Sequence, residues 1–188
     1  MPDYQTVRDP HSSVPPLTSK EKWTLFAKET IDPFNLLSAA MGAGMSQMGD
    51  QTPKYGAGKG ALGQRMGAAV ADMTAQNLFA IGLACALHQD PRYYRKGPDH
   101  NVLKRAAYSV SRLAVVRNDA GKNTFNSSGL FGMALGIGAS NLYYPSASAN
   151  TGVMLGRLNT SLSSGVIGNL MSEFWPDIQQ KLLHRRRH

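Results

Sequence analysis

The sequence predicts an all-α fold: a single helical domain of about six to seven helices packed through small Gly and Ala residues. Three observations support this prediction: long segments rich in Ala, Leu and Met, small residues repeated at helical spacing, and almost no alternating strand pattern. At 188 residues the chain is long enough for one domain with its own core. We divide it into an extended or disordered arm (1–17), a helical domain (18–183) and a basic tail (184–188).

Capping and proline signals mark the first helices. Thr18 and Glu21 fit a capping box, so a helix is expected to begin there. Pro33 suits the first turn of a second helix over 34–48. The glycines and prolines of segment 49–60 then predict a loop.

The later helices are predicted from apolar segments that are bounded by proline, glycine or asparagine residues. The clearest is 61–88, which contains no proline and ends before Asp90-Pro91. Further helices are expected over 100–116, 128–142 and 151–174, and Pro176 is expected to open a short last helix. The run Ala114-Val115-Val116 is too short to predict a strand.

Small residues four positions apart predict close helix contacts of the glycine-zipper type. A glycine inside a helix costs about 1 kcal/mol relative to alanine, so repeated glycines indicate that close approach compensates. The pattern suits helix pairs in lipid and also tight packing inside a soluble bundle. The residues expected at such interfaces are Gly63, Gly67, Ala71, Gly132, Gly136, Gly152 and Gly156.

A long stretch of the chain is almost free of charge. Between Thr124 and Ser172 the only charged side chain is Arg157, which predicts burial in a core, in a partner or at a membrane. The strictly apolar run 130–139 is about half of the roughly 20 residues that a spanning helix needs. We therefore expect shallow or interfacial membrane contact, and a homo-oligomer formed through the helices over 128–142 and 151–174.

The net charge of +8 favours anionic partners. An anionic membrane surface or an envelope polymer fits best, and nucleic acid fits less well because aromatic residues alternate with basic ones only at 92–96. The residues expected to bind an anionic partner are Arg92, Arg95, Lys96, Arg185, Arg186 and Arg187.

A hydrolytic or metal-dependent site would have to form around His88, Asp90 and His100, which carry the densest group of titratable side chains. Their spacing matches no known catalytic or metal-binding pattern, and a helix C-terminus accounts for His88 and Asp90 as capping residues. We therefore expect no catalytic residue, no metal and no cofactor.

Several short phrases occur together in this chain. They are Leu17-Thr18, Ile31-Asp32-Pro33-Phe34, Tyr55-Gly56, Arg65-Met66-Gly67, His88-Gln89-Asp90-Pro91, Ser140-Asn141-Leu142 and Glu173-Phe174-Trp175-Pro176. Over about 17–184 the chain resembles a family of envelope-associated proteins of acidobacteria that have no assigned activity. The resemblance implies an exported location and no functional residues. Members carry an export signal, whereas residues 1–4 of this chain are polar and predict none.

These observations predict a non-enzymatic structural or binding protein of the cell envelope, membrane-associated or self-assembling through glycine-rich helix faces. Two alternatives stay open at this point. One is the enzyme with a site around His88, and the other is a basic helical module that binds nucleic acid.

Overall fold

The computed structural model describes residues 3–9, 12, 14–33, 35–37, 39–40, 44, 59–142 and 151–185. The chain is 71% helical with only small strand fragments, which confirms the all-α class. The helices are η1 (Asp3–Gln5), α1 (Ser19–Ile31), α3 (Lys59–Ala86), α4 (Val102–Ser111), α5 (Ser127–Ser140) and α6 (Thr151–Arg185). The strands are β1 (Thr6–Val7), β2 (Gln89–Asp90), β3 (Tyr93–Tyr94), β4 (Val115–Asn118) and β5 (Asn123–Phe125).

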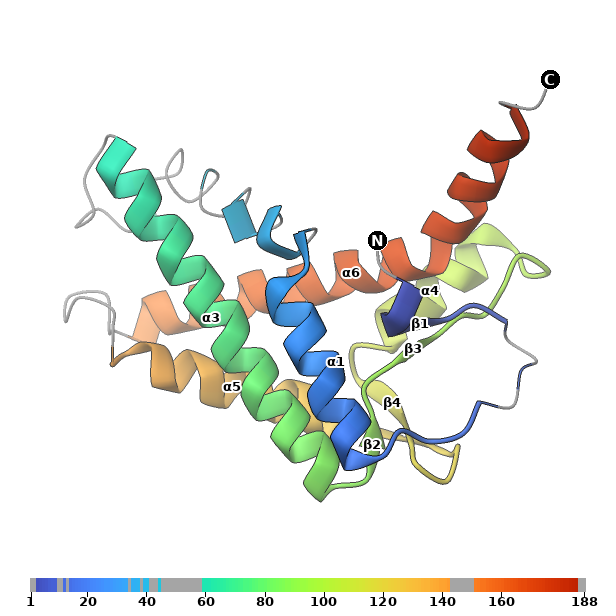
Figure 1. Ribbon diagram of the computed structural model, residues 1–188, viewed down its shortest axis with the longest axis horizontal. Coiled ribbons are helices and arrows are strands. Elements are labelled where there is room, and N and C mark those ends of the chain that lie inside the picture. The colour runs from blue at the N-terminus through green and yellow to red at the C-terminus, as the bar shows by residue number, and fades with distance from the viewer. Residues whose placement is uncertain are drawn as a thin grey trace.

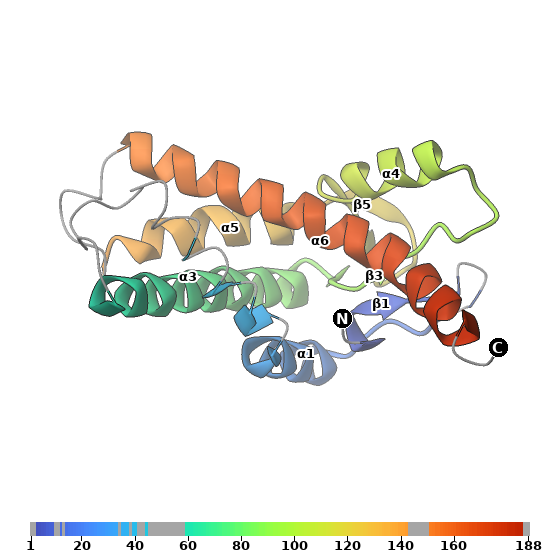
Figure 2. The ribbon, with the colours of Figure 1, turned by 90° about the horizontal axis from the view of Figure 1, so that it is seen from above.

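Three long helices form the body of the molecule. Helix α5 packs along α3, α6 runs beside α5, and α1 lies against α3 (Figures 1 and 2). The strands, α4 and the C-terminal part of α6 gather at one end, and the first turns of α3 and α6 lie at the other. The molecule therefore has a strand-containing end and a purely helical end.

The start of α1 follows the sequence signal. The Thr18 hydroxyl oxygen accepts from the backbone N–H of Glu21, and the Glu21 carboxylate accepts from the backbone N–H of Thr18. This reciprocal pair is the predicted capping box. The predicted helix over 34–48 lies mostly outside the described residues, of which 35–37 and 39–40 are helical.

Two glycines allow the close contact between α5 and α3. A Cβ atom built at Gly132 would lie 2.6 Å from the Ala80 Cα, and one built at Gly136 would lie 2.7 Å from the Gln76 Cα. Real Cβ atoms do not approach backbone this closely, so both positions need glycine for this packing. The two helices bury each other's small residues here.

Three of the other proposed packing positions face open space in the part of the chain that the structure describes. Nothing lies within 4 Å of a Cβ built at Gly63, Gly67 or Gly156, and Gly152 is exposed. Ala71 is half-buried. Gly63 and Gly67 are open because α5 approaches α3 only further along, at Gln76 and Ala80, so a second copy of the chain or lipid stays the predicted contact of this face.

The short strands are decided by pairing and not by local pattern. Val115 and Val116 belong to β4, which pairs antiparallel with β2 and β5, so the run that seemed too short for a strand does form one. Strand β1 pairs parallel with β3, and Val7 is buried. The N-terminal arm is therefore attached to the strand-containing end.

Helix α6 continues through Pro176, where a helix boundary was expected. Proline removes one backbone hydrogen bond and usually kinks a helix, and Figure 1 shows α6 changing direction toward its C-terminus. Pro176 is buried between Glu173 and Asp177, whose side chains are both fixed by arginines. These tertiary contacts keep the segment helical.

Candidate functional site

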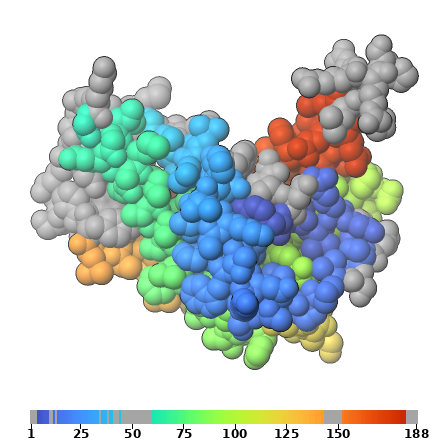
Figure 3. Space-filling view, in the orientation of Figure 1, coloured from blue at the N-terminus to red at the C-terminus, as the bar shows by residue number. Residues whose placement is uncertain are grey.

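Helix α3 exposes an apolar surface. It is long and apolar enough by length and composition to cross a membrane over Gly60–Ala86, and only 11% of its most apolar 18-residue window is buried. Leu62, Met66 and Leu78 are each 40–42% exposed. Figure 3 shows α3 along the surface of the molecule, beside α1. A core helix of a soluble protein would be mostly buried, so α3 is compatible with membrane association.

The neighbouring helices α5 and α6 also expose apolar side chains. On α5, Phe131 and Leu135 are 58% and 49% exposed and lie four positions apart on one side of the helix, and Leu142, just after the helix, is 90% exposed. On α6, Leu155 and Ile167 are 59% and 61% exposed. Single exposed apolar residues are ordinary, but a series on adjacent helices marks a surface for interaction.

Charged side chains in this helical end turn inward. Arg65 is 3% exposed, although it lies one residue from the exposed Met66. Arg157, the single charge of the long uncharged stretch, donates from Nη1 to the Ser140 hydroxyl at 2.8 Å, and Ser140 in turn donates to the Ile137 carbonyl. These two arginines are thereby turned away from the exposed apolar side chains, which is where lipid tolerates charge, although Gln64 and Asn159 are exposed on the same helices.

The strand-containing end holds a buried ionic cluster centred on Glu173, which is 0% exposed. The Glu173 carboxylate accepts from Arg105 Nε at 2.8 Å and from the Tyr93 hydroxyl at 3.0 Å. It also accepts from the backbone N–H groups of Lys96 and Gly97. Four donors satisfy this carboxylate, so its charge can be held away from water.

Two arginines join Glu173 to Asp177, one turn further along α6. The Arg105 and Arg95 guanidinium groups each donate to an Asp177 oxygen and to the Glu173 backbone carbonyl. Burial opposes ionisation of Asp177, but the hydrogen bonds from Arg105 and Arg95 outweigh it and lower the pKa of its carboxyl. Two arginines and two carboxylates thus form a neutral unit.

The cluster has a weak signal in the sequence. Glu173 and Asp177 are four residues apart on a helix, directly after a long stretch with a single charge. Their arginine partners come from a loop and from α4, about 70 positions earlier in the chain. Sequence reasoning missed the cluster because nothing local connects these segments.

The basic residues proposed to bind an anionic partner are mostly engaged internally. Arg95 is 6% exposed and pairs with Asp177 at 2.7 Å, and Arg92 pairs with Asp90 at 2.6 Å. Contrary to expectation, the charges of Arg92 and Arg95 are therefore neutralised within the chain. Lys96 Nζ lies 5.2 Å from the Tyr108 ring centroid. The side chain of Arg185 and the whole of Arg186 and Arg187 lie outside the described residues.

His88, Asp90 and His100 do not form a joint site. His88 has a left-handed φ of 51° just after α3, and its exposed ring faces Asp119 at 3.7 Å. Asp90 is buried and accepts hydrogen bonds from Arg92 and from the Tyr94 hydroxyl. Burial opposes its ionisation, but the bonds from Arg92 outweigh this and lower the pKa of the Asp90 carboxyl. Among the described residues no group of three or more His, Cys, Asp and Glu could hold a metal.

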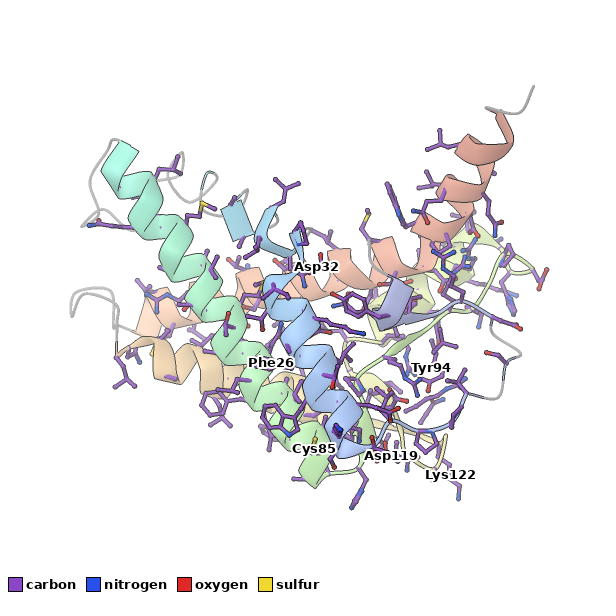
Figure 4. The ribbon with its side chains drawn as sticks, viewed as in Figure 1. Phe26, Asp32, Cys85, Tyr94, Asp119 and Lys122 are labelled. Atoms are coloured by element: carbon purple, nitrogen blue, oxygen red, sulfur yellow. The ribbon has the colours of Figure 1, made fainter. Side chains whose placement is uncertain are left out.

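A further internal ion pair fixes α1 to the strand-containing end. Lys22 is 2% exposed, and its ammonium group donates to both Asp119 oxygens at 2.9 Å and to the Ala84 carbonyl. Figure 4 shows Asp119 beside the N-terminal end of α1. This contact positions α1 against α3.

No family model, curated protein or solved structure matches this chain. The resemblance to acidobacterial envelope proteins therefore stays a prediction, and the functional interpretation depends on the geometry alone.

Proposed function

We propose that this chain is a non-enzymatic structural or binding protein of the cell envelope that associates with a membrane through the apolar surface of α3 and α5. The observation that carries the proposal is helix α3, which is apolar over Gly60–Ala86 yet only 11% buried over its most apolar window. Such a surface in water would be unfavourable by about 25 cal/mol per Å² of exposed apolar area.

The dimensions of α3 suit a lipid bilayer. At 1.5 Å per residue its 27-residue apolar part is about 40 Å long, compared with about 30 Å for the hydrocarbon core. The inward orientation of Arg65 and Arg157 keeps charge away from the same surface. Because α1 and α5 pack against α3, a peripheral position with the outer face of α3 and α5 in the acyl chains fits the helix better than a lone crossing.

Self-association through the open small-residue face is the second form of this proposal. Gly63 and Gly67 leave the α3 backbone uncovered within the chain, and this is the geometry that helix pairs in lipid use. A second copy seated on α3 would cover Leu62 and Met66 in the same way that lipid would.

Flotation with vesicles of equimolar phosphatidylcholine and phosphatidylglycerol tests the proposal. We expect the protein to float with the vesicles, and Met66→Lys to remain at the bottom of the gradient, because a lysine at this depth opposes insertion by about 2–4 kcal/mol. Leu103→Lys is the matched control, since Leu103 is 76% exposed on α4 at the other end of the molecule. It should float like the parent.

Light scattering in detergent-free buffer shows whether a protein that does not float is a monomer or an oligomer. A soluble monomer that does not float overturns the proposal in both forms. A stable oligomer that does not float, and that Met66→Lys dissociates, favours a second copy of the chain over lipid as the cover of α3.

A further inference from the structure

We propose that Arg112 and Arg117, together with Lys96, form a binding site for a phosphate group. The three cations surround Tyr94 and Tyr108 at the strand-containing end of the molecule, where Figure 4 marks Tyr94. Of the three, only Lys96 was among the basic positions expected from sequence to bind an anion; Arg112 and Arg117 are new, and the site does not depend on contact between α3 and a membrane.

Arg112 is a buried cation without an acidic partner. It is 7% exposed at the C-terminal end of α4, and its hydrogen bond is to the Asn123 side-chain oxygen at 3.0 Å. No carboxylate of the described residues lies within ion-pair distance of it. Burial, with Arg117 nearby, lowers the pKa of its guanidinium group. Buried charges in proteins are normally paired, so Arg112 is short of an anion.

The pairing of β4 with β5 brings Arg117 close to Arg112. In the β4–β5 ladder Arg117 lies directly opposite Asn123, so the two side chains emerge on one face. Asn123 accepts from Arg112, and Arg117 is near enough to contribute to the lowered pKa of the Arg112 guanidinium group. The Arg117 guanidinium stacks 4.2 Å from the Tyr94 ring centroid, and no described carboxylate pairs with it.

Lys96 completes the group. Its Nζ atom and the Arg112 guanidinium carbon lie 5.2 and 5.6 Å from the centroid of the Tyr108 ring. The acidic side chains near these tyrosines, Asp90 and Glu173, are already paired with Arg92 and Arg105. Three positive charges therefore surround the two tyrosines with no counter-charge from the described part of the chain.

The side chains select a phosphate in preference to a nucleobase. Guanidinium groups bind phosphate through two parallel N–H donors. Stacking of bases needs an open aromatic face, whereas the Tyr94 ring is 7% exposed and carries Arg117. The hydroxyls of Tyr94 and Tyr108 donate to Asp90 and to the Tyr94 carbonyl, so they do not compete for the anion.

Titration of inorganic phosphate against the full chain, at ionic strength matched with chloride, tests this inference. We expect phosphate to raise the midpoint of thermal unfolding, because a ligand of the folded state stabilises it. Arg117→Gln should weaken the apparent affinity about tenfold, as expected for loss of one charge-assisted contact. Arg117 is half-buried and makes no ion pair, so this variant is expected to fold.

Lys104→Gln provides the control, because Lys104 is exposed on α4 and the substitution removes the same charge. It should leave the phosphate response unchanged. Equal effects of phosphate and chloride on the parent, or equal weakening in Lys104→Gln and Arg117→Gln, would overturn the inference. Side-chain NMR signals of Arg112 that do not move with phosphate would also overturn it.

Two further arms identify the source of the phosphate. A response to inorganic phosphate and glycerol 3-phosphate that Arg117→Gln weakens indicates a soluble phosphorylated ligand. If inorganic phosphate has no effect, and Arg117→Gln weakens binding to phosphatidylglycerol vesicles, the ligand is a lipid headgroup. Met66→Lys separates this site from the proposed function, since it should abolish flotation and leave the response to inorganic phosphate intact.

Discussion

The two ends of this molecule place their polar and apolar groups in opposite ways. At the strand-containing end Glu173, Arg105 and Arg95 are at most 6% exposed, and their charges are paired within the chain. At the helical end Leu142 and Leu155 are 90% and 59% exposed. Helix α6 passes through both environments, from the uncharged turns after Thr151 to the ionic cluster at Glu173.

The difference shows how each end is stabilised. Ion pairs hold the strand-containing end together, because each buried carboxylate meets several donors and so compensates for the loss of water. The helical end is held by close backbone contact between α5 and α3, while its outer surface keeps hydrocarbon groups that no described element covers. One end pairs its buried carboxylates within the chain, and the other is suited to a partner or to lipid.

The largest expected effect comes from neutralising the centre of the ionic cluster. Glu173→Gln keeps the shape of the side chain but leaves Arg105 without its buried counter-charge, so we expect a loss of about 3–5 kcal/mol in the free energy of unfolding. Urea denaturation measures it. The control Asp99→Asn, at an exposed position, should change stability by less than about 0.5 kcal/mol. Equal stabilities for the two variants would contradict the structural role of the cluster.

Glu29 is a carboxylate without an arginine partner among the described residues, and its ionisation should lower the stability of the folded protein as the pH rises. Burial, with a further contribution from Asp32, raises the pKa of Glu29 to about 7 in the folded state despite a hydrogen bond from Gln5. The folded form therefore keeps a proton that the unfolded chain loses near pH 4.5. Stability should fall between about pH 4.5 and 7 and then level off, with a total decrease of about 2–3 kcal/mol.

Glu29→Gln isolates this effect. The variant should match the parent at pH 4 and exceed its stability at pH 8, as measured by urea unfolding at both values. A parent that is equally stable at pH 4 and pH 8 after correction with this variant would show that Glu29 ionises normally in the folded protein.

The glycine contacts allow a matched pair of substitutions. Gly132→Ala would place a methyl group 2.6 Å from the Ala80 backbone and should cost about 1–3 kcal/mol through overpacking. Gly67→Ala enters open space in α3 and should instead stabilise the helix by up to about 1 kcal/mol. Thermal unfolding of both variants in detergent-free buffer checks the signs. Destabilisation by Gly67→Ala would indicate that another molecule covers this face.

The smallest effect is expected at the exposed apolar surface. Leu142→Gln should change the free energy of unfolding by less than about 0.5 kcal/mol, because the side chain is 90% exposed and leaves no cavity. Chemical denaturation of the isolated protein is the measurement. A loss of several kcal/mol would mean that the isolated protein already buries this residue.

The sequence by itself determined the helical class and the start of α1. Capping boxes depend on residues three positions apart, and helix propensity is local, so Thr18 and Glu21 were sufficient to place the first turn. The absence of charge around Arg157 likewise predicted an apolar surface or core before any fold was known. The spacing of Gly132 and Gly136 indicated a close contact, because both lie on one face of their helix.

Only the tertiary structure decided which groups meet. Arg105 and Glu173 are 68 positions apart, and no local pattern distinguishes arginines that pair internally, such as Arg95, from those that stay unpaired, such as Arg117. Pro176 looked like a helix boundary, and Val115 looked too isolated for a strand, until the arginines around α6 and the pairing with β2 and β5 were known. Spacing fixes which residues share a face of one helix, but the path of the chain through space fixes what that face contacts.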